Sequence, residues 1–156
     1  MRLQGKVALV TGATYGIGTT IAERLAEEGA SVVFTGRSAD KGEALQERFR
    51  SLGLAVTFVQ GDVAEEADVK RAIAAAVDTY GSITTVVNNA AATEVTKPGG
   101  GDSHVTEIEN EAFDRVIRVG INSVLWTSKH AIPHMQAASG GRSSTSQPHP
   151  VPTRRH

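Results

Sequence analysis

The chain has 156 residues, of which 40% are apolar, and its charged side chains leave a net charge of −1 at pH 7. This length suits one domain with a buried core, and the near-neutral charge gives no reason to expect nucleic acid or an anionic membrane as a partner. The sequence contains no cysteine, which excludes disulfides, thiolate metal sites and cysteine nucleophiles.

Targeting and membrane segments are not expected either. Residues 1–6 are charged but are not followed by an apolar signal-peptide core, and no apolar run approaches the ~20 residues of a membrane-spanning helix. These features, with the lack of cysteine, predict a soluble protein of the cytoplasm.

Short β-branched runs alternate with segments of helical apolar spacing over the first part of the chain. Strands are expected at residues 7–10, 31–35, 55–59 and 83–87. Helices are expected at residues 21–29, 41–53 and 65–81, each ended by a glycine. This alternation predicts βαβ units with right-handed crossovers, and therefore an α/β fold with a parallel sheet covered on both faces.

The pattern changes after the fourth strand. Residues 92–110 are polar and glycine-rich and predict a surface loop, in which Thr106 and Glu109 could form a capping box. Residues 111–135 have helical apolar spacing and predict one long helix. We therefore expect an incomplete domain over residues 1–139, followed by an irregular tail over residues 140–156.

The segment TGATYGIG, residues 11–18, lies directly between the first strand and the first helix. Glycine at such a turn lets the backbone approach a pyrophosphate, and the helix N-terminus offers unpaired N–H groups. In this strand–turn–helix context the pattern predicts a dinucleotide site. The alternative is that the glycines serve only the turn and its packing.

Four motifs in chain order resemble those of the short-chain dehydrogenase/reductase family, whose members bind NAD(P) on a Rossmann fold. The family pattern Thr-Gly-x-x-x-Gly-x-Gly is matched by Thr11, Gly12, Gly16 and Gly18. Its adenine-contacting Asp-Val is matched by Asp62-Val63, and its Asn-Asn-Ala-Gly by Asn88-Asn89-Ala90-Ala91, with alanine in the last place. Residues 113–135 resemble the long interface helix of the family.

The resemblance implies a Rossmann-type, doubly wound parallel sheet, truncated here after about four strands and the long helix. It also implies an alcohol or carbonyl substrate and allows a homo-oligomer formed through residues 111–135. The cofactor-binding residues that it implies are Thr11, Gly12, Thr14, Tyr15, Gly16, Ile17, Gly18, Arg37, Ser38, Asp62, Val63, Asn89, Ala90 and Ala91.

The end of the second strand indicates which cofactor to expect. NAD enzymes of this fold usually place a carboxylate there for the ribose 2′-hydroxyl. Here the sequence is Gly36-Arg37-Ser38, and a guanidinium can bind a 2′-phosphate through two parallel hydrogen bonds. We therefore predict NADP(H) over NAD(H). The alternative is that Arg37 is an ordinary solvated surface side chain.

The catalytic residues of the family are not found. Its catalysis needs a tyrosine followed four residues later by lysine, and also a serine and an asparagine. Neither Tyr15 nor Tyr80 is followed by lysine at that distance, and Gly120 occupies the asparagine position. Asn122, two residues on, is expected on another helix face. We assign no catalytic residue and expect the chain to be inactive alone.

Other candidate sites are weak. His130 and His134 have the i, i+4 spacing of two metal ligands, but no third ligand is evident, so we expect surface histidines and no metal. Ser103 and His104 are neighbours without any sign of a nucleophile–base pair. Trp126 is interpreted as a packing or interface residue.

The tail suggests a frameshift. A family strand Ala-Ile-Val-Asn, read one base later, can encode only Leu, Pro, Gln or Arg, then Leu or Ser twice, then Ile or Thr. Residues 142–145, Arg-Ser-Ser-Thr, obey all of these restrictions. We hypothesise a frameshift near Gly140–Gly141; the alternative is a genuine disordered Ser/Pro tail.

Three functional hypotheses follow. The first is an NADP(H)-dependent oxidoreductase by ancestry, of which this chain is the nucleotide-binding part. The second is a non-catalytic nucleotide-binding or interaction module with a natural tail. The third is a frameshifted product without function.

Overall fold

The computed structural model describes residues 1–93 and 104–138 of the chain. Its four strands form one parallel sheet in the order β3-β2-β1-β4. The strands are β1 (Val7–Val10), β2 (Ser31–Gly36), β3 (Val56–Gln60) and β4 (Thr85–Val87). The chain winds outward from β1 first in one direction and then in the other, which confirms the predicted doubly wound α/β fold.

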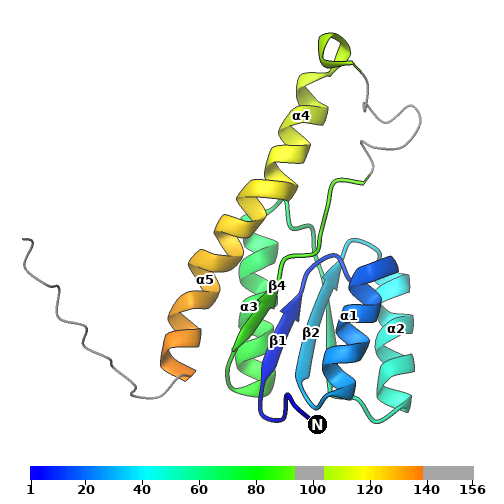
Figure 1. The fold of residues 1–156 in the computed structure, drawn as a ribbon, viewed down its shortest axis with the longest axis vertical. Helices are drawn as coiled ribbons and strands as arrows, with labels where there is room; N and C mark the ends of the chain where they lie inside the picture. The colour runs from blue at the N-terminus through cyan, green and yellow to red at the C-terminus, as the bar shows by residue number, and fades with distance from the viewer. Residues whose placement is uncertain (94–103, 139–156) are drawn as a thin grey trace, which may run out of the picture.

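Helices cover both faces of this sheet. Figure 1 shows α1 (Gly16–Glu27) and α2 (Ala39–Ser51) together on one face, with α3 (Glu66–Tyr80) and α5 (Ser123–Ala138) on the other. Successive side chains of a strand point to opposite faces of the sheet, so alternate residues of β1 contribute to the two helix layers. Val7 and Leu9 of β1 pack in the cluster of α3 and α5, whereas Ala8 and Val10 pack in the cluster of α1 and α2.

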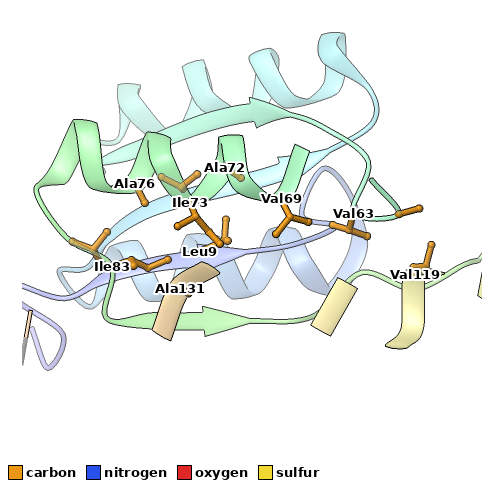
Figure 2. Packing of buried hydrophobic residues seen from close by; sticks show 12 residues of the cluster. Leu9, Val63, Val69, Ala72, Ile73, Ala76, Ile83, Val119 and Ala131 are labelled. Carbon is orange, nitrogen blue, oxygen red and sulfur yellow. The ribbon is translucent and has the colours of Figure 1, made fainter. Parts of the chain in front are cut away.

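The core is apolar on both sides of the central strand, as a parallel sheet requires. Leu9 is fully buried, and Figure 2 shows it beneath α3, where Ala72 and Ile73 face it. On the opposite face, the ring of Phe34 packs against Phe49 of α2 with ring centroids 6.0 Å apart.

The predicted helix ends are confirmed, and the boundaries elsewhere shift by a few residues. Gly29, Gly53 and Gly81 have φ angles of +96°, +77° and +79°, which glycine adopts without strain. The largest shift is at the start of α1, which begins within the glycine turn at Gly16. β4 begins later than expected because the Thr84 side chain bonds both backbone groups of Val7.

The predicted long helix is not one regular helix. Residues 110–138 form α4 (Asn110–Ile117), a π-helical turn η2 (Arg118–Asn122) and α5. The Ser123 N–H donates to the Arg118 carbonyl, so the wide turn adds one residue to the helical repeat. Gly120 lies in this turn, and a β-carbon built on it would meet nothing within 4 Å. The long helix predicted over residues 111–135 is therefore confirmed, with a π-helical turn at its centre that the sequence did not predict.

The predicted capping box of Thr106 and Glu109 was wrong. Thr106 lies inside a short 3-10 helix, η1 (Val105–Glu107), and is not the N-cap of α4. Glu109 is itself the N-cap of α4 and makes no side-chain capping bond. Because Thr106 lies within η1 and Glu109 is the N-cap residue itself, the two side chains cannot cap each other's backbone N–H groups.

Some predictions lie outside the described residues. These are the centre of the loop over residues 92–110, Ser103, and the tail over residues 140–156 with its hypothesised frameshift. None of the helices in residues 1–93 and 104–138 combines the length and the apolarity needed to span a membrane.

Candidate functional site

An open cleft of about 990 Å³ lies at the carboxyl ends of the strands. This is where the strand order reverses, the position at which open α/β sheets bind ligands. Every cofactor-binding residue predicted from the sequence lines the cleft except Thr11. Further lining residues, which the sequence did not single out, are Thr35, Gly36, Lys41, Gly61, Thr93, Arg115 and Val119.

The glycine turn keeps backbone open to this cleft. Gly12 and Gly16 have φ angles of +64° and +60°. A β-carbon on Gly12 would lie 2.7 Å from the Ala90 Cα, and one on Gly18 would lie 2.5 Å from the Gly12 carbonyl oxygen. Glycine is thus required at Gly12 and Gly18 by close approach and at Gly16 by its backbone angle alone.

The start of α1 fits an anionic group. Its N-cap residue is Tyr15, whose side chain accepts no hydrogen bond from the first N–H groups of the helix. These groups and the helix dipole attract negative charge. The turn therefore has the shape and the donors that a pyrophosphate requires.

Thr11 and Asn89 join the glycine turn to the end of β4. Thr11 is buried, and its hydroxyl accepts from the backbone N–H groups of Asn89 at 3.1 Å and Ala90 at 3.2 Å. The Asn89 amide donates to the carbonyls of Thr11 at 3.1 Å and Gly12 at 3.0 Å. Both side chains therefore shape the turn, and Thr11 does so from below the cleft surface.

Asn88 anchors the same loop to α5. The fully buried Thr127 hydroxyl donates to the Asn88 side-chain oxygen at 2.8 Å and is also 3.0 Å from the Val124 carbonyl. The sequence reasoning missed Thr127. The signal that could have found it is a small polar side chain on the otherwise apolar, core-facing side of the helix.

The end of β2 contributes the basic part of the cleft. Arg37 and Ser38 line it directly after the strand, and no acid lies at this position. Ser38 is the N-cap of α2, and its hydroxyl accepts from the Lys41 N–H at 3.4 Å. Lys41, one turn into α2, is a second cation on the same wall.

The end of β3 contributes the acidic part. The Asp62 carboxylate accepts from the Ala64 N–H at 2.9 Å and pairs with the Arg115 guanidinium at 2.9 Å. Arg115 comes from α4, far along the chain, which is why the sequence reasoning missed it. Val63 is buried beside Asp62 and packs in the core cluster below the cleft.

Tyr15 bridges the mouth of the cleft. Its hydroxyl lies 2.8 Å from that of Thr93, which follows the end of β4, and either oxygen can donate. The Tyr15 ring is otherwise exposed. The glycine turn and the loop after β4 are thus joined twice. The bonds among Thr11, Asn89 and Ala90 form the first connection, and the Tyr15 and Thr93 hydroxyls form the second.

Two other side chains singled out in the sequence, Tyr80 and Trp126, do not line the cleft. Residues 1–93 and 104–138 contain no cluster of three or more histidine or acidic side chains able to hold a metal ion. The Tyr80 hydroxyl lies 2.9 Å from that of Thr57. Trp126 packs against the core cluster of α3, as its packing interpretation predicted.

His130 contacts a carboxylate of α3. Its Nε2 lies 2.7 Å from the Glu66 carboxylate, which also accepts from Lys129 at 3.0 Å. Hydrogen bonds from His130 first, and then from Lys129, hold the pKa of Glu66 below its ordinary value. His130 is half-buried by this contact, so it differs from the simple surface histidine that we expected, whereas His134 is exposed.

The comparisons with known proteins agree with this geometry. A family model described as short chain dehydrogenase matches residues 6–143. The chain is 38% identical over 139 residues to an uncharacterized oxidoreductase of Thermotoga maritima, covering 89% of this chain and 52% of the relative. It is 37% identical over 142 residues to an NADP-dependent (R)-specific alcohol dehydrogenase of Lentilactobacillus kefiri, covering 91% and 53%.

A solved structure of a short chain dehydrogenase is also similar to this chain. A short chain dehydrogenase from Burkholderia cenocepacia in complex with NADP superimposes with a TM-score of 0.77 at 32% identity, covering 86% of this chain and 53% of that one. The chain therefore spans about half the length of the relatives that it matches.

Proposed function

The chain belongs to the short-chain dehydrogenase/reductase family, and from this premise we propose that its cleft binds NADP(H) in preference to NAD(H). The observation that carries the preference is the end of β2, where Arg37 and Ser38 line the cleft and no carboxylate is present. A carboxylate would accept from a ribose hydroxyl, whereas a guanidinium attracts a 2′-phosphate. The L. kefiri relative is NADP-dependent and the B. cenocepacia structure contains NADP, which supports the proposal.

Three parts of the cleft would hold the cofactor. The glycine turn and the start of α1 would bind the pyrophosphate, because they offer backbone N–H groups at a positive helix end. Arg37 and Ser38 would bind the 2′-phosphate, and Asp62 with Val63 would contact the adenine. When bound, the nicotinamide supplies or accepts a hydride.

We propose that this chain binds the cofactor without turning over a substrate. Family catalysis uses a tyrosine whose pKa is lowered by a nearby lysine, and the sequence contains no Tyr-x-x-x-Lys. The reaction of the family, hydride transfer between NADP(H) and an alcohol or carbonyl, would then need residues equivalent to the other half of the relatives. The second candidate is a module whose own role is to bind a nucleotide or a protein partner, and not to serve as part of an oxidoreductase. Gly120 at the position of the family asparagine favours this candidate.

We also propose that copies of the chain can pair through α4 and α5. Six large apolar side chains of α4, η2 and α5 are exposed: Phe113, Val116, Ile121, Val124, Leu125 and Ile132. Burying these side chains against the same segment of a second copy is favourable. Sedimentation of the chain at several concentrations tests this proposal, and a monomer at every concentration would contradict it.

Titration of the 156-residue chain with NADPH and NADH tests the cofactor preference. We expect NADPH to bind at least about tenfold more tightly, since hydrogen bonds to charged groups contribute roughly 1.5–3 kcal/mol. Arg37→Ala should weaken NADPH binding and leave NADH binding unchanged. Lys70→Ala is the control, because it removes an exposed positive charge of α3 that does not line the cleft. An Arg37 variant with the parent NADPH-to-NADH ratio would contradict the assignment.

A further inference from the structure

We propose that Arg115 is a positioning residue for the adenine end of the cofactor, because it fixes the Asp62 carboxylate as a hydrogen-bond acceptor facing the cleft. The inference rests on the proposed function, in which Asp62 contacts the adenine. Its structural basis is the ion pair between α4 and the loop that follows β3. No local sequence pattern around either residue points to the other.

Asp62 is held from three directions. Its backbone N–H donates to the Asp68 carboxylate of α3 at 2.8 Å. Its Oδ1 accepts from the Ala64 N–H at 2.9 Å and from Arg115 Nη2 at 3.2 Å. Its Oδ2 lies 2.9 Å from the same Arg115 nitrogen. The backbone of Asp62 and the torsion of its carboxyl group are therefore both fixed.

One oxygen of the Asp62 carboxylate, Oδ2, keeps an acceptor position for a ligand. An ionised carboxylate has about four lone-pair positions, two on each oxygen. Among residues 1–93 and 104–138, Ala64 and Arg115 use both positions of Oδ1, and Arg115 uses one of Oδ2. One position of Oδ2 is left in a side chain that lines the cleft. This oxygen can accept from the exocyclic amino group of adenine.

The pair is sheltered enough to hold this geometry. The side chains of Arg115 and Asp62 are only 24% and 28% exposed, and both line the cleft. An exposed surface pair fixes little, because solvent and side-chain entropy compete with it. Figure 1 shows α4 beyond the carboxyl ends of the strands, so that its side chains can reach the loop after β3.

A neighbouring arginine provides a matched comparison. Arg118, one turn further along, pairs with Glu65 at 3.1 Å and donates to the Ala64 carbonyl at 3.4 Å. Arg118 thus ties the same helical segment to the same loop, but it makes no hydrogen bond to Asp62 and does not line the cleft. Removal of Arg118 shows what the connection between helix and loop contributes by itself. Removal of Arg115 weakens that connection and also frees the Asp62 carboxylate to rotate.

The experiment compares two cofactors that differ at one group. NADPH carries adenine, and its hypoxanthine analogue replaces the exocyclic amino donor with a carbonyl oxygen. Affinities of both are measured for the parent chain and for Arg115→Met, Arg115→Lys and Arg118→Met, with thermal unfolding of each variant as a check of folding. The quantity of interest is the ratio of the two affinities, since a general loosening of the site weakens both cofactors equally.

The parent chain is expected to prefer NADPH at least about tenfold, because the analogue turns an acceptor toward a carboxylate. In Arg115→Met the ratio should fall at least about threefold, since a carboxylate held only by Ala64 can rotate and take water instead. Arg115→Lys should give an intermediate ratio, because lysine keeps the charge but is a more flexible and more strongly hydrated partner for the carboxylate. Arg118→Met should keep the parent ratio even where both affinities decrease.

Two results overturn the inference in different ways. An Arg115→Met ratio equal to or above that of the parent overturns the role of Arg115 and leaves the proposed cofactor site standing. Failure of the parent chain to bind NADPH overturns the proposed function, and the inference falls with it.

Discussion

The Thr11 hydroxyl accepts a hydrogen bond from the Asn89 N–H at 3.1 Å, and the Asn89 side-chain amide donates back to the Thr11 carbonyl at 3.1 Å. These reciprocal bonds connect the end of β1 with the end of β4, which are neighbouring strands of the sheet. They place the two loops that line the floor of the cleft. Their loss should therefore affect both folding and the shape of the cleft.

Thr11→Val tests this connection. Valine keeps the volume of the side chain but removes the hydroxyl that accepts from the N–H groups of Asn89 and Ala90. The Asn89 N–H keeps its second bond, to the Val87 carbonyl at 3.1 Å, so the loss falls mainly on Ala90. We expect a loss of about 1–3 kcal/mol in the free energy of unfolding, measured by urea denaturation. Thr20→Val is the control, since Thr20 is exposed on α1. Equal stability of the two variants would show that the Thr11 hydroxyl contributes nothing.

Thr35→Val should have the opposite effect. Thr35 is buried at the end of β2, and its hydroxyl oxygen has no hydrogen-bond partner among residues 1–93 and 104–138. The adjacent cavity of about 10 Å³ is at the lower limit for one water and is lined mainly by apolar atoms. A hydroxyl without a partner costs about 1–3 kcal/mol in a buried site, so valine should stabilise the fold by about 1 kcal/mol or more.

Urea denaturation of Thr35→Val gives the comparison with the parent chain. A loss of stability would show that the hydroxyl has a partner, such as a water in the small cavity. If stability rises but NADPH binding weakens, the hydroxyl serves the ligand instead of the fold.

Gly12 and Gly16 should respond differently to alanine. A β-carbon on Gly12 would collide with Ala90, whereas one on Gly16 would meet nothing within 4 Å. Gly16→Ala should therefore lose only the ~1–2 kcal/mol of a left-handed backbone angle. Gly12→Ala has the same angular cost and must also displace the loop that follows β4, so a loss above about 4 kcal/mol or a failure to fold is expected. Similar unfolding midpoints for the two variants would contradict the close approach.

The sequence predicted the features of this fold that depend on local patterns. The glycine ends of three helices, the apolar strands and the turn of residues 11–18 each carry their signal within a few neighbouring residues. The π-helical turn was not predictable, because one extra residue shifts the apolar spacing too little to be distinguished from a regular helix. The Asp62–Arg115 pair was missed because it joins elements distant in the chain.

The contact between Arg2 and Glu28 should make the stability of the fold depend on pH in acid. Glu28 accepts hydrogen bonds from the Arg2 side chain and the Arg2 N–H, and these two bonds are the main reasons that its pKa falls from 4.5 to about 2. A carboxylate with a lowered folded-state pKa stabilises the fold fully above its unfolded pKa and loses that contribution as pH falls toward the folded pKa. The contribution of Glu28 should therefore be present at pH 6 and disappear between pH 4.5 and about 2.

Glu28→Gln isolates this effect, since glutamine keeps the size of the side chain and cannot ionise. The urea midpoint of the parent chain should exceed that of the variant at pH 6, and the difference should shrink to nearly zero at pH 2. Added salt should reduce the difference at pH 6, because Arg2 is exposed and the pair is screened. A difference that stays constant from pH 6 to pH 2 would mean that the substitution acts through packing, and that the ion pairs of Glu28 with Arg2 and Arg24 do not stabilise the fold.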